Sequence, residues 1–236
     1  MYEYLVGCFI LSAIWSVGFV LRKDLRRPMI WSGLAYIIVS TVLFVGLRTL
    51  AVFGIGQTIT PNYWNPKTLF NLALTTGGYG IEDVLFMFFI GGVATFVYEL
   101  ALQRKIKVVK SYKHHLRAPL IGVAAALLFE ILFKANWIYA LAVFGFAAAA
   151  SIWIESKNLI GHSLLGGMIL AIVYFAAFVL FNQIFPGFIQ KAYNFQNISG
   201  ILILGVPLEE LLYAFSFGLA WSPIYEYEHG EKTVKI

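Results

Sequence analysis

The sequence is poor in charged residues and in cysteine. Only 12% of its 236 residues are charged and 60% are hydrophobic, whereas a soluble globular domain carries about 25% charged residues. This composition excludes an ordinary soluble domain and predicts an integral membrane protein. The single cysteine, Cys8, excludes an intrachain disulfide and a cysteine-based metal cluster.

Several motifs and clusters are absent as well. The chain has no Gly-x-Gly-x-x-Gly stretch and no aspartate-rich diphosphate–magnesium motif, which argues against flavin binding and against a prenyltransferase. The net charge of +5 lies in loops, so we expect contacts with lipid headgroups and no nucleic acid. The histidines also lie in or beside expected loops, so we interpret them as interfacial and expect no metal site and no cofactor. They are His114, His115, His162 and His229.

Seven apolar runs are each long enough to cross a hydrocarbon core about 30 Å thick. They cover residues 2–21, 29–47, 78–102, 118–133, 137–153, 164–185 and 200–225. The first run has no basic segment ahead of it, so we interpret it as a retained span and not as a cleaved signal peptide. Lysine and arginine concentrate in the loops after the first and third runs, which predicts a cell-membrane protein with its N-terminus outside and its C-terminus in the cytoplasm.

Two acidic pairs interrupt this apolar pattern. Glu82-Asp83 and Glu209-Glu210 each lie inside an apolar run, and the two pairs lie 127 positions apart. Carboxylates are costly inside a membrane, so they mark a functional site by default. The same offset relates further residues without a gap, which indicates an internal repeat. These are Leu85 and Leu212, Phe88 and Phe215, Gly91 and Gly218, Tyr98 and Tyr225, and Glu99 and Glu226.

The repeat predicts an all-α membrane fold with seven transmembrane helices. Residues 1–102 form the first three-helix repeat, residues 103–135 a basic loop and a linking helix, and residues 136–236 the second repeat. A single linking helix makes the repeats parallel, so a pseudo-two-fold axis runs along the membrane normal and brings the acidic pairs to one depth. Gly91-Gly92 and Gly166-Gly167 are interpreted as helix-packing surfaces.

Neighbouring residues on a helix point about 100° apart, so one acid of each pair should face a shared cavity. We assign Glu82 and Glu209 to that cavity, with Asp83 and Glu210 as supporting partners, and treat all four as catalytic. Because Pro207 fixes the start of the second acidic helix, the protonated acid is expected in the second half. The first pair would then steady a cation and accept the proton. Glu99 and Glu226 should be solvated helix ends at the cytoplasmic surface.

A second set of residues is assigned to substrate binding. Phe86 and Tyr213 lie one helical turn beyond the inward acids, where aromatic faces can stabilise a cation, although an aromatic core stripe is the simpler explanation for them. Glu130 should lie at a similar depth, either in the cavity or in a structural pair. The complete set is Phe86, Phe89, Tyr213, Phe217, Asn65, Asn194 and Glu130.

The Pro207-Leu208-Glu209-Glu210 motif, together with the Trp64-Asn65-Pro66 and Asn194-Phe195 loops, resembles the small membrane-bound lycopene cyclase family in its fused form. Gly80 stands where the first motif of that family usually has proline. The resemblance implies cyclisation of the linear ends of lycopene to ionone rings, that is, a lycopene β-cyclase. A carboxyl protonates a terminal olefin, a second double bond attacks the cation, and a carboxylate or water removes a ring proton, with no net redox change. The lipophilic polyene would come laterally from the bilayer.

Other functions remain open at this point. An intramembrane prenyl-protein protease also carries Glu-Glu on a span, but the arginine and the intramembrane histidines of that type are missing here. A proton-coupled transporter or a non-catalytic carotenoid-binding protein also fits parallel repeats with acids in the membrane. A cyclase needs a dry, laterally open cavity, whereas a carrier needs a polar path to both faces. A homo-oligomer is compatible with the sequence.

Overall fold

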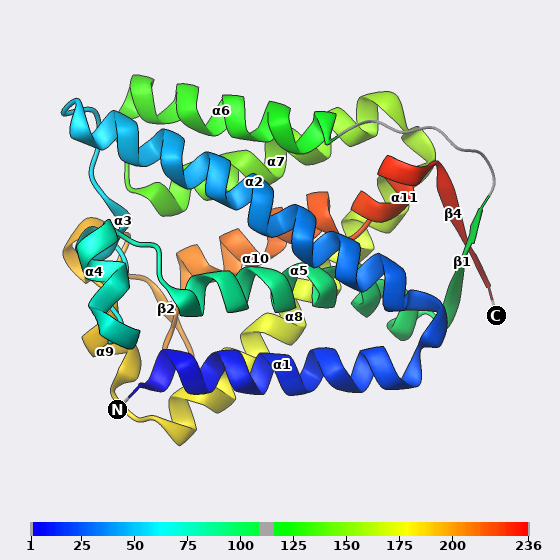
Figure 1. Ribbon diagram of the computed structural model, residues 1–236, viewed down its shortest axis with the longest axis horizontal. Coiled ribbons are helices and arrows are strands. Elements are labelled where there is room, and N and C mark those ends of the chain that lie inside the picture. The colour runs from blue at the N-terminus through cyan, green and yellow to red at the C-terminus, as the bar shows by residue number, and fades with distance from the viewer. Residues whose placement is uncertain (1, 109–115, 236) are drawn as a thin grey trace.

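A computed structural model describes residues 2–108 and 116–235, and helices make up most of this part of the chain. Figure 1 shows the long helices running along one axis, with the short helices α3, α4 and α9 at one end and the strands β1 and β4 at the other. The N-terminus lies at the end with the short helices, which we call the capped end, and the C-terminus lies at the strand end.

The first half of the chain contains three long helices. Its elements are α1 (Glu3–Leu21), η1 (Lys23–Leu25), α2 (Arg26–Val52), α3 (Ile59–Asn62), η2 (Leu69–Asn71), α4 (Leu72–Thr76) and α5 (Ile81–Ala101). Among the described residues between the halves are β1 (Arg104–Val108) and α6 (Arg117–Phe133).

The second half repeats the order of long helix, 3-10 turn, long helix, short cap elements and acidic helix. Its elements are α7 (Trp137–Glu155), η3 (Lys157–Leu159), α8 (Ile160–Ile184), α9 (Phe188–Ala192), η4 (Phe195–Asn197), β2 (Leu202–Ile203), β3 (Val206–Pro207), α10 (Leu208–Trp221), α11 (Ile224–His229) and β4 (Glu231–Lys235). The pseudo-two-fold axis between the halves stays a prediction.

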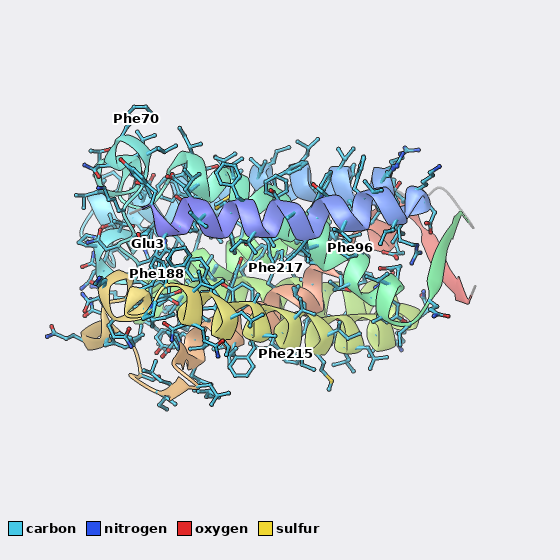
Figure 2. All side chains as sticks on the ribbon, turned by 90° about the horizontal axis from the view of Figure 1, so that it is seen from below. Glu3, Phe70, Phe96, Phe188, Phe215 and Phe217 are labelled. Carbon is cyan, nitrogen blue, oxygen red and sulfur yellow. The ribbon has the colours of Figure 1, made fainter. Side chains whose placement is uncertain are left out.

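Five helical segments are apolar and long enough to cross a membrane: α1, α2 with η1, α5, α7, and α8 with η3. Many of their large apolar side chains face outward, as lipid contact requires. Figure 2 shows the same contrast elsewhere in the protein, since Phe70 of η2 projects from the surface whereas Phe217 of α10 lies between helices. The protein therefore has the character of a multi-pass membrane protein. Helices α6 and α10 are shorter, at 17 and 14 residues.

The last apolar run is not one helix from residue 200, contrary to the prediction. Residues 202–203 pair with residues 206–207 as an antiparallel hairpin, and α10 begins only at Leu208. Gly200 and Gly205 have positive φ angles, which are incompatible with a regular α-helix through these residues. Pro207 then fixes the backbone at the start of the first helical turn. The acids of the second half consequently stand at a helix N-terminus.

Glycines allow the long helices to approach closely. A Cβ atom on Gly91 would lie 3.0 Å from the carbonyl oxygen of Ser32, and one on Gly167 would lie 3.1 Å from the backbone nitrogen of Leu219. These contacts join α5 to α2 and α8 to α10, as small residues do in membrane proteins. The predicted packing role of both glycine pairs is confirmed.

The predicted basic loop contains a strand that the sequence did not indicate. Residues 104–108 pair antiparallel with residues 231–235 at the strand end of the bundle. His114 and His115 fall outside the described residues.

Candidate active site

A cavity of about 400 Å³ opens between the two halves near the capped end. Its walls come from α1, α2, α5, α7, α8 and α10 and from the segments that close this end. Aliphatic and aromatic side chains form most of the lining, and the carboxyl groups in it are those of Asp83 and Glu210. One carboxyl group from each half therefore reaches a shared, largely apolar space.

The two cavity acids occupy equivalent positions at the starts of their helices. Gly80 caps α5 and Pro207 caps α10, so Asp83 and Glu210 are each the third helical residue. A negative charge is favourable there because the helix dipole is positive at its N-terminus. Asp83 and Glu210, which are 127 positions apart as the repeat predicts, therefore have the same position in their helices.

Asp83 is held by its own helix and by α1. One carboxylate oxygen accepts a hydrogen bond from the backbone N–H of Gly80 at 2.7 Å, and the other accepts from the Tyr4 hydroxyl at 3.0 Å. The bond to Gly80 closes the first turn of α5 as a capping interaction. Asp83 is therefore fixed at the cavity wall by a short side chain.

Glu210 has a different environment, because Pro207 has no N–H to offer at the cap. Its carboxylate instead accepts hydrogen bonds from Tyr63, and from Tyr174 at 2.6 Å. Burial and the Glu210 carboxylate raise the pKa of Tyr63 well above its usual range, and the same two causes raise the pKa of Tyr193. These hydroxyls consequently stay protonated and available as donors.

Glu82 and Glu209 do not line the cavity, which corrects the predicted assignment. Both are buried, but each carboxylate supports the loop ahead of its helix. Glu82 accepts from the backbone N–H of Leu69 at 2.7 Å, and Glu209 accepts from that of Ser199 at 2.8 Å. Loops that return to each helix supply these donors, so the first acid of each pair turns toward its loop and the second toward the cavity.

Among the predicted aromatic contacts, Phe86 and Tyr213 line the cavity. The hydroxyl of Tyr213 lies 2.6 Å from that of Tyr36, which fixes both rings in the wall. Phe89 packs against Trp15 instead, with ring centroids 5.9 Å apart. Phe217 is buried beneath Tyr213, with their rings stacked at 5.8 Å, so neither Phe89 nor Phe217 belongs to the lining.

Asn65 and Asn194 join the two end loops through their backbones and do not line the cavity. The N–H of Asn65 donates to the carbonyl of Ala192 at 2.7 Å, and the N–H of Asn194 donates to the carbonyl of Tyr63 at 3.0 Å. These reciprocal bonds hold the loops of the two halves together over the capped end.

Three further acids lie away from the cavity. Glu130 is buried on α6, where it closely approaches Gly56. Glu99 and Glu226 are not solvated helix ends, contrary to the prediction, because they are buried beside His162. His162 is likewise not interfacial. The cause is that α10 ends at Trp221 and the chain turns there, so that α11 packs against α2 and closes the strand end of the bundle.

Tyrosines that bind the cavity acids were not among the predicted site residues. Tyr4 and Tyr174 come from α1 and α8, whereas Tyr63 comes from the segment after α3. A hydroxyl inside an apolar run needs a polar partner, so the positions of Tyr4 and Tyr174 within predicted spans were the available signal, whereas Tyr63 lies between two predicted spans. Their sequence separation from Asp83 and Glu210 hid the pairing.

Comparison with protein families gives a match over both halves of the chain. Residues 2–101 and 136–228 match the family described as lycopene cyclase. The chain belongs to the lycopene cyclase family. The two matched stretches contain the two cavity acids and leave out residues 102–135, which include α6. No curated protein and no solved structure matches the chain. Membership of the lycopene cyclase family supports a carotenoid cyclase, as the sequence motifs predicted.

Proposed function

We propose that this lycopene cyclase family member converts the linear ends of lycopene to β-ionone rings in the cavity between Asp83 and Glu210. The observation that carries the proposal is the pairing of two carboxyl groups in one apolar, aromatic cavity. Cyclisation adds one proton and removes another, so it needs an acid and a base without a redox cofactor. A carrier would need a polar path, and the apolar lining favours the cyclase.

Glu210 is the proposed acid. Donation of its proton to a terminal double bond leaves a carboxylate, and the hydroxyls of Tyr63 and Tyr174 are placed to stabilise that charge. Hydrogen bonds to an ionised group are stronger than those to a neutral one, so they favour proton release. The acid thus lies in the second half of the chain, as the proline-containing motif predicted, but at its second glutamate.

The tertiary cation formed by protonation is then attacked by a double bond of the same polyene end, which closes the ring. Asp83 is the proposed base that accepts the ring proton, and Tyr4 orients its carboxylate. The faces of Phe86 and Tyr213 in the wall stabilise positive charge, and the apolar lining keeps out water that would quench the cation.

The size of the cavity limits the length of polyene that it can enclose. A volume of about 400 Å³ lies within the range of pockets for drug-sized ligands. It suits one end of a long polyene, with the remainder left in the bilayer. Two ends would therefore react in sequence in the same cavity.

The proposed portal lies between α1 and α8. Ile10 on α1 and Leu180 and Ile184 on α8 line the cavity and are also 39%, 59% and 60% exposed on the outer surface. In Figure 2 these two helices lie next to each other on the near side of the bundle. Side chains that border both the cavity and the lipid suit lateral access for an apolar chain.

The orientation in the membrane follows from charge. We propose seven spans, with α6 linking two parallel halves, the N-terminus and the cavity toward the outside, and the strand end toward the cytoplasm. Tags at the N-terminus and in the loop before α6 should report opposite faces. Finding both on one face would overturn this topology.

Expression in lycopene-producing bacteria tests the activity. Pigment chromatography should show monocyclic and bicyclic products with β rings in cells that make the protein. Unchanged lycopene in cells with membrane-inserted protein would reject the proposal, and ε rings would reject the ring type.

A further inference from the structure

Three ionisable side chains meet at the strand end of the bundle, remote from the cavity. Glu99 comes from the last turn of α5, His162 from the first turn of α8 and Glu226 from α11. They are 0%, 5% and 1% exposed, respectively. Figure 1 places the C-terminal end of α5 and α11 beside β1 and β4, whereas the cavity lies toward the capped end.

The spacing of this cluster suits shared coordination of an ion. The Nε2 atom of His162 lies 3.5 Å from Oε1 of Glu99, and its Nδ1 atom lies 3.9 Å from Oε1 of Glu226. One ligand atom from each residue can be chosen so that all three lie within 4.8 Å of one another. A transition-metal ion held about 2.0–2.2 Å from each ligand needs only small side-chain rotations to fit this arrangement.

The histidine ring is held in place. The ring of Tyr98 stacks on it with centroids 3.7 Å apart and an angle of 18° between the planes. Such stacking limits rotation of the imidazole, and orientation by neighbouring groups is typical of metal-ligating histidines.

The burial of Glu99 points independently to a ligand. The Glu99 side chain is fully buried, and the groups that face its carboxylate are the ring of His162 and the second acidic group of the cluster, Glu226. The nearby Arg22 donates to the backbone carbonyl of Glu99 at 3.3 Å, and its guanidinium is paired with Asp24. Burying a carboxylate in this way is costly unless a cation neutralises it.

We propose that Glu99, His162 and Glu226 bind one divalent transition-metal ion. Two carboxylates and a neutral imidazole balance a dication, and this mixed oxygen and nitrogen set suits manganese, iron(II) or zinc. The ion joins α5, α8 and α11 at the point where β1 and β4 leave the bundle, and water completes its coordination. Glu99 and Glu226 are the repeat-related pair at the offset of 127, so each half supplies one carboxylate.

The test uses the full chain, purified in detergent through a tag without histidine. Elemental analysis should find about one equivalent of a transition metal per chain. After removal by a chelator, Co²⁺ added alone should give the visible absorption of a protein-bound ion, and Mn²⁺ added alone should raise the melting temperature. Substoichiometric metal at background level, together with no response to either ion, would overturn the proposal.

Variants locate the ion. Glu99→Gln, His162→Gln and Glu226→Gln should each weaken Co²⁺ affinity at least tenfold. Glu228→Gln is the matched control, since Glu228 is a buried acid on the same helix that instead accepts from the backbone N–H of Leu116 at 2.9 Å. Equal Co²⁺ affinity in all four variants would place the metal elsewhere. Because these measurements do not depend on turnover, they separate the metal site from the proposed cyclase activity.

Discussion

Replacing Glu210 by glutamine removes the proposed proton donor with little change in size. The amide oxygen can still accept from one tyrosine, so one of the two tyrosine hydrogen bonds at this site is lost. The proposed resting acid is protonated and therefore neutral, and a neutral hydrogen bond contributes about 0.5–1.5 kcal/mol, so the variant should be less stable by that order and still insert. General acid catalysis contributes about 10²- to 10⁴-fold, and we expect cyclisation to fall by a similar factor.

The assay is pigment chromatography from lycopene-producing cells, with yields divided by the amount of membrane-inserted protein. Asp83→Asn should give a comparable loss. The matched control is Glu209→Gln, which keeps a carbonyl oxygen for the N–H of Ser199. A neutral hydrogen bond contributes about 1 kcal/mol, so this control should stay within roughly tenfold of the unmodified protein. Normal turnover in Glu210→Gln, or an equal loss in Glu209→Gln, would refute the assignment of the cavity acids.

Three further changes probe the walls, the packing and the portal. Tyr63→Phe and Tyr174→Phe each remove one donor to Glu210, and each should lower turnover about tenfold, as measured in isolated membranes; unchanged turnover in both would exclude the tyrosines from acid activation. Gly145→Ala places a Cβ atom 2.5 Å from the backbone of Ser216 on α10 and should cost about 1–3 kcal/mol in thermal unfolding, whereas Gly161→Ala, with open space around it, should not. Leu180→Trp places a larger side chain in the proposed portal and should slow the conversion of added lycopene. An unchanged rate would place substrate access elsewhere.

Composition and periodicity were sufficient to predict most of the long helices and the acidic pairs near the starts of α5 and α10. The apolar runs at residues 2–21 and 137–153 correspond closely to α1 and α7, because every residue there must satisfy its backbone within the helix. The Glu-Asp and Glu-Glu pairs also mark the cavity, since acids are rare inside apolar runs. These features depend on local sequence alone.

The choice between adjacent acids could not be made from local sequence. Adjacent side chains point about 100° apart, and either could have faced the cavity. The first acid of each pair turns away from the cavity because it accepts a hydrogen bond from a backbone N–H in the preceding loop. The donors are Leu69, 13 residues before Glu82, and Ser199, 10 residues before Glu209. Positive φ angles at Asn71 and Gly200 shape those loops, and the sequence pattern does not reveal where such a loop returns.

The burial of Glu99 and Glu226 was hidden for a related reason. Both follow long apolar stretches, and helix ends of that kind are usually solvated. The chain instead turns at Ser222 and Pro223, and Tyr225 packs on Trp31 with ring centroids 5.7 Å apart. This contact joins residues from opposite halves, so it depends on the tertiary fold.

The repeat supplies two equivalent positions, and the cap residue makes them chemically unequal. Where glycine caps the helix, its N–H binds the acid three residues later, and Asp83 is held by its own turn. Where proline caps the helix, there is no N–H, and Glu210 is left to bind tyrosines from other elements. A reaction that both donates and accepts a proton needs two carboxyl groups in different environments. The difference between Gly80 and Pro207, together with the shorter side chain of Asp83, therefore accounts for the proposed division of acid and base between halves of common design.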